Sequence, residues 1–195
     1  MSVQATFAAT LVDEWIRGGV TDAVLCPGSR STPLALALAS RPELRLHVRL
    51  DERGAGFFAL GLGMATERPA PVCTTSGTAA AELHPAVMEA HHGGVPLLAC
   101  TADRPPELHH VGAPQTVDQS RLYGTAVRWS CEPGVPEAEA AWTWRALAAR
   151  SVAEACGGPR PPGPVHLNLA FREPLAGEAD TLPAGRPGGA PWYGP

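Results

Sequence analysis

Residues 71–103 read PVCTTSGTAAAELHPAVMEAHHGGVPLLACTAD, and this stretch decides the fold. Two apolar runs, PVCTT ending at Thr75 and PLLACT ending at Thr101, flank a helix-compatible segment over residues 79–92. Neither run alternates polar and apolar residues, which is typical of strands that are covered on both faces. Because a helix of this length returns the chain in the same direction, the stretch predicts a right-handed βαβ unit.

The same alternation of strand and helix recurs along the chain. Strand-like runs also end at Cys26 (DAVLC) and Leu50 (LHVRL), so the four runs end 24, 25 and 26 residues apart. Further helix-compatible segments cover residues 5–17, 32–39, 53–66 and 137–156, and further strand-like runs cover residues 125–131 and 164–170. The pattern predicts a three-layer α/β/α domain with a mainly parallel, doubly wound sheet of about six strands.

The last 22 residues differ from the rest in composition. Gly and Pro supply 10 of residues 174–195, and no apolar periodicity continues there. Such a segment is typical of a linker. We therefore expect one domain over residues 3–173 and a Gly/Pro-rich linker over residues 174–195 that leads to a further, central domain of a longer protein.

Composition and charge exclude several classes of protein. All 15 basic residues are Arg, so neither a Walker A lysine nor a Schiff-base lysine is present, and the net charge of −4 argues against nucleic acid as a partner. The five cysteines form no CxxC pair, which predicts neither a disulfide framework nor a metal site. Asp13 and Glu14 interrupt the first apolar stretch, and no apolar run approaches the length of a membrane span. These features predict a reduced, cytoplasmic protein with no membrane span.

Polar loops follow the four regularly spaced strand runs, at the sheet edge where open parallel sheets bind ligands. They are PGSRSTP (27–33), DERG (51–54), SGT (76–78) and ADRPP (102–106). Helix N-termini and Arg side chains at such an edge favour an anion. Each loop also has a purely structural interpretation. These are a capped helix for the first loop, a first-turn helix carboxylate for Glu52, a tight turn for SGT, and a local ion pair for Asp103 and Arg104.

Taken together, four of these segments carry a family resemblance. VLCPGSRSTPLALAL, HVRLDERGAGFFALGLG, TTSGTAAAELHPAVMEA and TADRPPEL…GAPQTVDQ resemble the N-terminal pyrimidine-binding (PYR) domain of thiamine-diphosphate enzymes. Among these enzymes the chain is most similar to the family of 2-succinyl-5-enolpyruvyl-6-hydroxy-3-cyclohexene-1-carboxylate synthases of menaquinone biosynthesis. The resemblance runs from about residue 6 to residue 174. It does not include the family's diphosphate-binding domain, so we expect this chain alone to be inactive.

The resemblance implies roles for seven residues. Glu52 matches the glutamate that binds the pyrimidine nitrogen N1′ of the cofactor and relays a proton, while Gly77 and Thr78 match residues that line the cofactor site. Four further residues match positions that hold isochorismate, and they are Ser29, Arg30, Arg104 and Gln115. The family has Asn where this chain has Pro114, directly before Gln115.

The resemblance also implies a reaction and its partners. The full enzyme is a transferase that decarboxylates 2-oxoglutarate and adds the resulting succinyl carbanion to isochorismate. It works as a homodimer or homotetramer with thiamine diphosphate and with Mg²⁺ or Mn²⁺, the metal being bound by the diphosphate-binding domain. Two alternatives remain open, namely another thiamine-diphosphate carboligase of the acetolactate-synthase type and a non-catalytic binding module of the same fold.

Overall fold

A computed structural model describes residues 1–193 of the chain. Six strands and six α-helices alternate along these residues. The strands are β1 (Asp22–Leu25), β2 (Arg45–Val48), β3 (Ala70–Thr74), β4 (Leu97–Asp103), β5 (Trp129–Cys131) and β6 (Pro164–Ala170). The helices are α1 (Val3–Arg17), α2 (Thr32–Ala39), α3 (Glu52–Thr66), α4 (Thr78–Ala81), α5 (His84–Gly93) and α6 (Ala141–Cys156).

The strands form one sheet in the order β2-β1-β3-β4-β6-β5, and every pair is parallel. The chain moves outward from β1 to β2 and then returns to add β3 on the other side of β1. The sheet is therefore doubly wound, with its topological switch point between β1 and β3. The predicted three-layer α/β/α architecture is confirmed.

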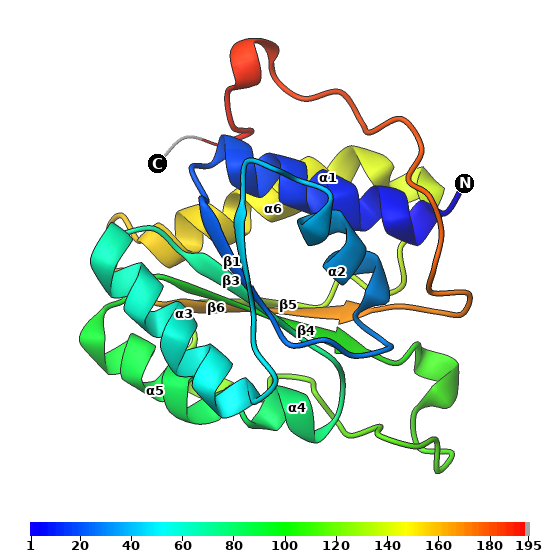
Figure 1. The fold of residues 1–195 in the computed structure, drawn as a ribbon, viewed down its shortest axis with the longest axis horizontal. Coiled ribbons are helices and arrows are strands. Elements are labelled where there is room, and N and C mark those ends of the chain that lie inside the picture. Colours follow the sequence, from blue (N-terminus) through cyan, green and yellow to red (C-terminus); the bar gives the residue numbers. More distant parts are fainter. Residues whose placement is uncertain (194–195) are drawn as a thin grey trace.

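The two faces of the sheet are covered by different helices, as Figure 1 shows. Helices α1, α2 and α6 lie on one face, and α3, α4 and α5 lie on the other. Phe7 and Trp15 of α1 pack with Trp144 of α6 in the first core, where the rings of Phe7 and Trp144 meet edge to face at 5.3 Å. The second core contains Ala59 of α3 and Val87 of α5. All seven residues of β4 are buried, which explains why its sequence does not alternate.

Several predicted elements have different bounds. The helix expected over residues 79–92 is two helices, because Pro85 in the first turn of α5 has no N–H to donate to the preceding turn. Of the run 125–131, only Trp129–Cys131 is a strand. On α6, Trp142 is 79% exposed, whereas Trp144 is buried.

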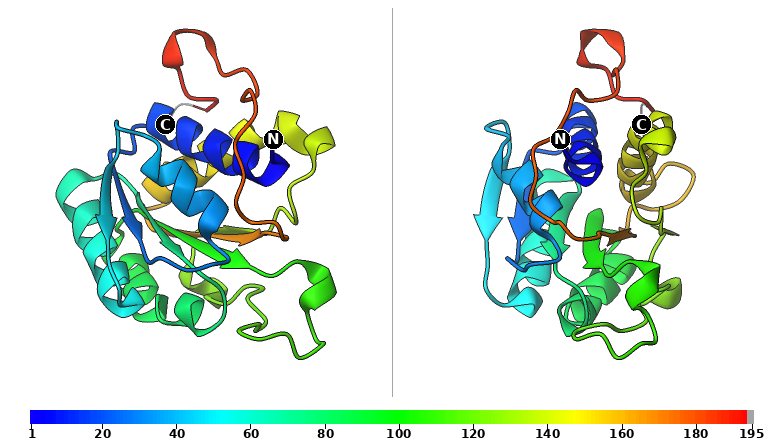
Figure 2. Two further views of the ribbon diagram at one scale, coloured as in Figure 1. Left: turned by 45° about the vertical axis from the view of Figure 1, so that its right-hand side comes forward. Right: turned by 90° about the vertical axis from the view of Figure 1, so that its right-hand side faces the viewer.

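Residues 174–193, which we call the C-terminal strap, run back over α1 and α6 (Figures 1 and 2). Leu175 is buried in the first core. Backbone bonds then fasten the strap, since Ser2 N donates to Glu178 O at 2.9 Å and Asp180 N donates to Thr6 Oγ1 at 2.8 Å. The Gly/Pro-rich segment is thus held against the domain by backbone hydrogen bonds, which its amino-acid composition does not predict.

A buried ionic cluster joins the strap to the helices. Arg145 of α6 bonds Asp13 at 2.7 Å and Glu14 at 2.8 Å, and it also donates to Pro183 O of the strap at 2.8 Å. Burial raises the pKa of Asp13, but hydrogen bonds from Arg145, Arg41 and Arg17 outweigh burial and lower that pKa to about 2. The cluster therefore holds α1, α6 and the strap together through charges that are paired.

Candidate functional site

The loops that follow β1 and β3 meet at the switch point of the sheet. A Cβ atom on Gly28 would lie 2.4 Å from Cβ of Thr75, so only glycine allows the two loops to approach this closely. The Ser31 hydroxyl donates to Gly28 O at 2.9 Å and fixes the first loop where α2 begins. The two loops therefore meet at the carboxyl ends of β1 and β3, where doubly wound sheets bind ligands.

Arg30, from the loop after β1, is buried against the residues that follow β6 and has an incomplete set of partners. Its side chain is 9% exposed; Nη1 donates to Phe171 O at 2.9 Å, and Nη2 lies 3.3 Å from Glu173 Oε1. Its Nε is buried without a hydrogen-bond partner in the described part of the chain. A buried guanidinium nitrogen without an acceptor is costly, so the arrangement favours an anion at this position.

Arg104 brings a second positive charge to the same place. It follows β4, and its Nη1 donates to the Ser76 hydroxyl. Burial and the charge of Arg30 both lower the pKa of Arg104, which places the two guanidinium groups within each other's field. Asp103 beside it is buried, and burial raises the pKa of its carboxyl group although Asn168 and the Arg104 N–H both donate to it.

Gly77 and Gln115 are in direct contact. Gly77 has φ +79°, and a Cβ atom there would lie 2.9 Å from Cγ of Gln115. The Gln115 amide donates to Ser76 O at 3.0 Å, and the Ser76 hydroxyl donates back to Gln115 O at 3.2 Å. The structure therefore brings together four of the residues predicted from the sequence, which are Arg30, Gly77, Arg104 and Gln115.

Glu52 is the first residue of α3 and is half-buried. Its two neighbours are used structurally, because Asp51 caps the helix by accepting from Arg53 N at 2.9 Å and pairs with the Arg53 guanidinium at 2.7 Å. Within residues 1–193 the Glu52 carboxylate has no hydrogen-bond or ion-pair partner. Burial, and then the nearby charge of Glu52, raise the pKa of the Cys26 thiol to about 12, so the Glu52 carboxylate lies within electrostatic reach of Cys26, the residue after β1.

Ser29 and Thr78 lie at the same edge of the sheet but are exposed, and no contact joins their side chains to the arginine pair in residues 1–193. Glu52 likewise lies at the carboxyl end of its strand without touching that pair. Of the seven predicted residues, Arg104 and Gln115 are thus bonded to each other through Ser76, next to Gly77. The charge of Arg30 acts on Arg104 without a bond between them, and the other three side chains stand apart on the same edge.

Two residues that we did not select from the sequence contact members of this group. Gln119 accepts from Gly77 N at 2.8 Å and donates to Asn168 Oδ1 at 2.8 Å, while fully buried. Glu173 approaches Arg30 from the end of β6. The sequence did not identify Gln119, because it lies with Gln115 in the segment GAPQTVDQ and only its burial in the structure sets it apart. It did not identify Glu173 either, because Glu173 and Arg30 are 143 residues apart in the chain.

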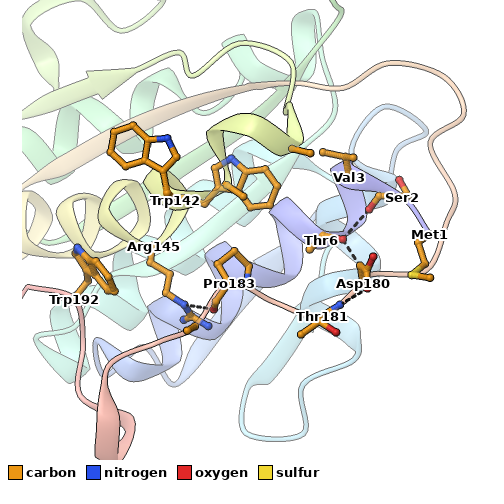
Figure 3. Close-up of a pocket in the computed structure, with 14 residues that line it drawn as sticks. Met1, Ser2, Val3, Thr6, Trp142, Arg145, Asp180, Thr181, Pro183 and Trp192 are labelled. Atoms are coloured by element: carbon orange, nitrogen blue, oxygen red, sulfur yellow. Dashed lines mark hydrogen bonds between the residues drawn. The ribbon is translucent and has the colours of Figure 1, made fainter.

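A cavity of about 790 Å³ lies away from this cluster, between the strap, α1 and α6 (Figure 3). Its lining includes Trp142, Trp144, Pro183 and Trp192, and it contains none of the seven predicted residues.

Among residues 1–193, no group of three or more His, Cys, Asp or Glu side chains is placed to hold a metal ion. No helix in the same range has the length and apolar character needed to cross a bilayer.

Comparisons with known proteins show the family of this chain. The family described as "Thiamine pyrophosphate enzyme, N-terminal TPP binding domain" matches residues 2–122. Two relatives are named 2-succinyl-5-enolpyruvyl-6-hydroxy-3-cyclohexene-1-carboxylate synthase. The protein of Thermobifida fusca is 55% identical over 98% of this chain, and that of Haloarcula marismortui is 52% identical over 99%. The chain spans about a third of the length of these relatives, 33% in each case. A family match over more than half of the chain, with relatives this similar, shows that the chain belongs to the thiamine pyrophosphate enzymes and contains their N-terminal TPP-binding domain.

Proposed function

We propose that this chain is the pyrimidine-binding part of a thiamine-diphosphate-dependent synthase that makes 2-succinyl-5-enolpyruvyl-6-hydroxy-3-cyclohexene-1-carboxylate from 2-oxoglutarate and isochorismate. The names of the relatives and the arginine cluster support this proposal. Residues 3–173 form the domain in this proposal, and residues 174–195 lead to a further domain. A diphosphate-binding domain, which also binds Mg²⁺ or Mn²⁺, completes the site in a cytoplasmic homodimer or homotetramer. This chain alone is then expected to have no turnover.

Glu52 suits the role of the group that meets the cofactor's pyrimidine nitrogen N1′. A half-buried carboxylate at a helix N-terminus, without a partner in residues 1–193, is free to share a proton with a heterocyclic nitrogen. When bound, the cofactor supplies the nucleophilic carbon that decarboxylates a 2-oxo acid. Glu52 then holds or releases a proton at its carboxyl oxygen, while Gly77 and Thr78 line the same edge of the sheet.

The acidic acceptor is proposed to bind at Arg30 and Arg104, and the observation that carries the assignment is the buried Nε of Arg30, which has no hydrogen-bond partner in residues 1–193. The charges of the two guanidinium groups repel each other, and in residues 1–193 the buried Nε of Arg30 has no acceptor, so an anion bound between them would relieve both costs. Isochorismate carries two carboxylates and fits this need. Gln115 and Ser29 complete the proposed contacts, with Ser29 accessible from solvent.

Kinetics of the complete synthase with Arg30→Ala and Arg104→Ala test this assignment. Each variant should raise the KM for isochorismate about 10- to 100-fold, because a charge-assisted hydrogen bond is lost, and should change the KM for 2-oxoglutarate much less. Arg150→Ala is a matched control, since Arg150 is exposed on α6, where it contacts Glu154 and the ring of Trp129 and none of the predicted site residues in residues 1–193. Equal effects on the two KM values would refute the assignment.

A further inference from the structure

Arg30 uses its guanidinium group differently from other arginines in this structure. Several of them bind a carboxylate through the Nε and Nη2 edge, with both nitrogens donating. These pairs are Arg45 with Asp22, Arg53 with Asp51, and Arg172 with Glu107. At Arg30 the same edge is only half used, because Nη2 meets Glu173 at 3.3 Å and the buried Nε meets nothing in residues 1–193. The edge is therefore suited to a carboxylate but is not filled by the one beside it.

Glu173 is loosely held at its carboxylate end. Its side chain is 66% exposed, and Arg30 is its ion-pair partner within the described residues. Its charge also acts on Arg104, whose pKa it raises against the effects of burial and of Arg30. The carboxylate thus lies in the field of both arginines that are proposed to bind the substrate.

The backbone around Glu173 is, in contrast, tightly anchored. Gln4 of α1 donates to Arg172 O at 2.6 Å and to Pro174 O at 3.3 Å, and it accepts from Arg172 N. Arg172 is also paired with Glu107. The Glu173 side chain is therefore delivered to Arg30 by a fixed turn, yet it can rotate into solvent without disturbing that turn.

We propose that Glu173 is a placeholder carboxylate, which occupies Arg30 while the site is free and gives way when a carboxylate of the acidic substrate takes the Nε and Nη2 edge. This inference rests on the proposed function. Glu173 competes with the substrate, so it weakens substrate binding and makes the site selective for an acid that can form the two-bond contact. If Glu173 instead only held Arg30 in position, it would strengthen substrate binding, and its removal would weaken that binding.

The test is the KM and kcat of the complete synthase carrying Glu173→Gln. Removal of the competing charge should lower the KM for isochorismate about two- to fivefold, the range that an exposed ion pair is worth, and leave the KM for 2-oxoglutarate unchanged. Glu173→Asp, which keeps the charge but shortens its reach to Arg30, should also lower the KM. Glu178→Gln is the matched control, because it removes an equal charge from an exposed position further along the same segment.

The outcomes separate this inference from the proposed function. If Arg30→Ala raises the KM for isochorismate while Glu173→Gln leaves it unchanged or raises it, the placeholder role is overturned and the substrate site stands. If Glu178→Gln lowers the KM as much as Glu173→Gln does, the effect is one of net charge and the placeholder role is overturned as well. If Arg30→Ala has no effect on isochorismate, both proposals fail.

Discussion

The side chain of Gln119 lies beneath the loops of the candidate site and is fully buried. One amide makes three bonds, because it accepts from Gly77 N and donates to Ala102 O and Asn168 Oδ1. It thereby ties the turn after β3 to the ends of β4 and β6. A buried amide with every group satisfied fixes one conformation of the turn, which the positive φ of Gly77 also requires.

Replacement of Gln119 should therefore destabilise the domain at a single residue. We expect Gln119→Leu to lower the free energy of unfolding by about 2–4 kcal/mol, since it leaves the buried Gly77 N–H and Ala102 C=O without partners. Urea unfolding followed by circular dichroism measures this change. A loss below about 0.5 kcal/mol would show that these bonds do not hold the turn.

At the scale of elements, the site depends on how closely two loops approach each other. Gly28 after β1 has no room for a side chain beside Thr75, whereas Gly61 on the outer side of α3 has no atom within 4 Å of the place that a methyl group would take. Two glycines of one domain thus differ in purpose. The first allows contact between loops, and the second contributes only backbone flexibility to a helix.

Alanine substitutions at these two glycines should have opposite effects. Gly28→Ala should lower the free energy of unfolding by about 1–3 kcal/mol, because its methyl group would force apart the loops after β1 and β3. Gly61→Ala should raise it by up to about 1 kcal/mol through better helix propensity. Thermal melts of the two variants check this, and a Gly28→Ala variant as stable as the wild type would contradict the close approach of the loops.

The apolar runs predicted the strands well, because a strand that is buried on both faces has an unbroken run of apolar residues, as β4 does. The same runs also predicted which polar loops lie at the carboxyl ends of the strands, because each loop directly follows a buried run. The prediction of one continuous helix across Pro85 was wrong, because an apolar pattern persists on both sides of the break. The docking of the strap and the approach of Glu173 to Arg30 could not be predicted, because they depend on backbone carbonyls and on pairs distant in sequence. The roles of all seven predicted site residues stay predictions.

At the scale of the whole molecule, burial of His166 couples stability to pH. His166 in β6 is 1% exposed and shares a 2.8 Å hydrogen bond with Thr101 Oγ1, and burial lowers its pKa to about 4. An unfolded histidine has a pKa of about 6.5. Between these values the unfolded state binds more protons, so stability is lost as the pH falls. Asp13, with a pKa of about 2, loses its contribution only at lower pH.

The wild type should accordingly lose about 2 kcal/mol of unfolding free energy between pH 7 and pH 5 through His166 alone. The variant His166→Asn should be less stable at pH 7 but should lack this part of the pH dependence. Urea unfolding of both proteins at the two pH values measures the difference in slope. Equal slopes would show that His166 is not the group that titrates.

The proposed chemistry of the whole molecule depends on the carboxylate of Glu52, which the fold presents at the sheet edge while Asp51 and Arg53 pair with each other. In the complete synthase, Glu52→Gln keeps the hydrogen-bonding shape but removes the ability to relay a proton. Stability should be unchanged, because Glu52 has no partner in residues 1–193. Glu89→Gln, at an exposed position of α5, is the control.

The most direct measurement is the rate at which the complete synthase exchanges the C2 proton of bound thiamine diphosphate. We predict that Glu52→Gln slows this exchange by about 10²–10⁴-fold, the usual contribution of a positioned acid–base group, while Glu89→Gln exchanges at the wild-type rate. Exchange at the wild-type rate in the Glu52→Gln protein would contradict the central claim.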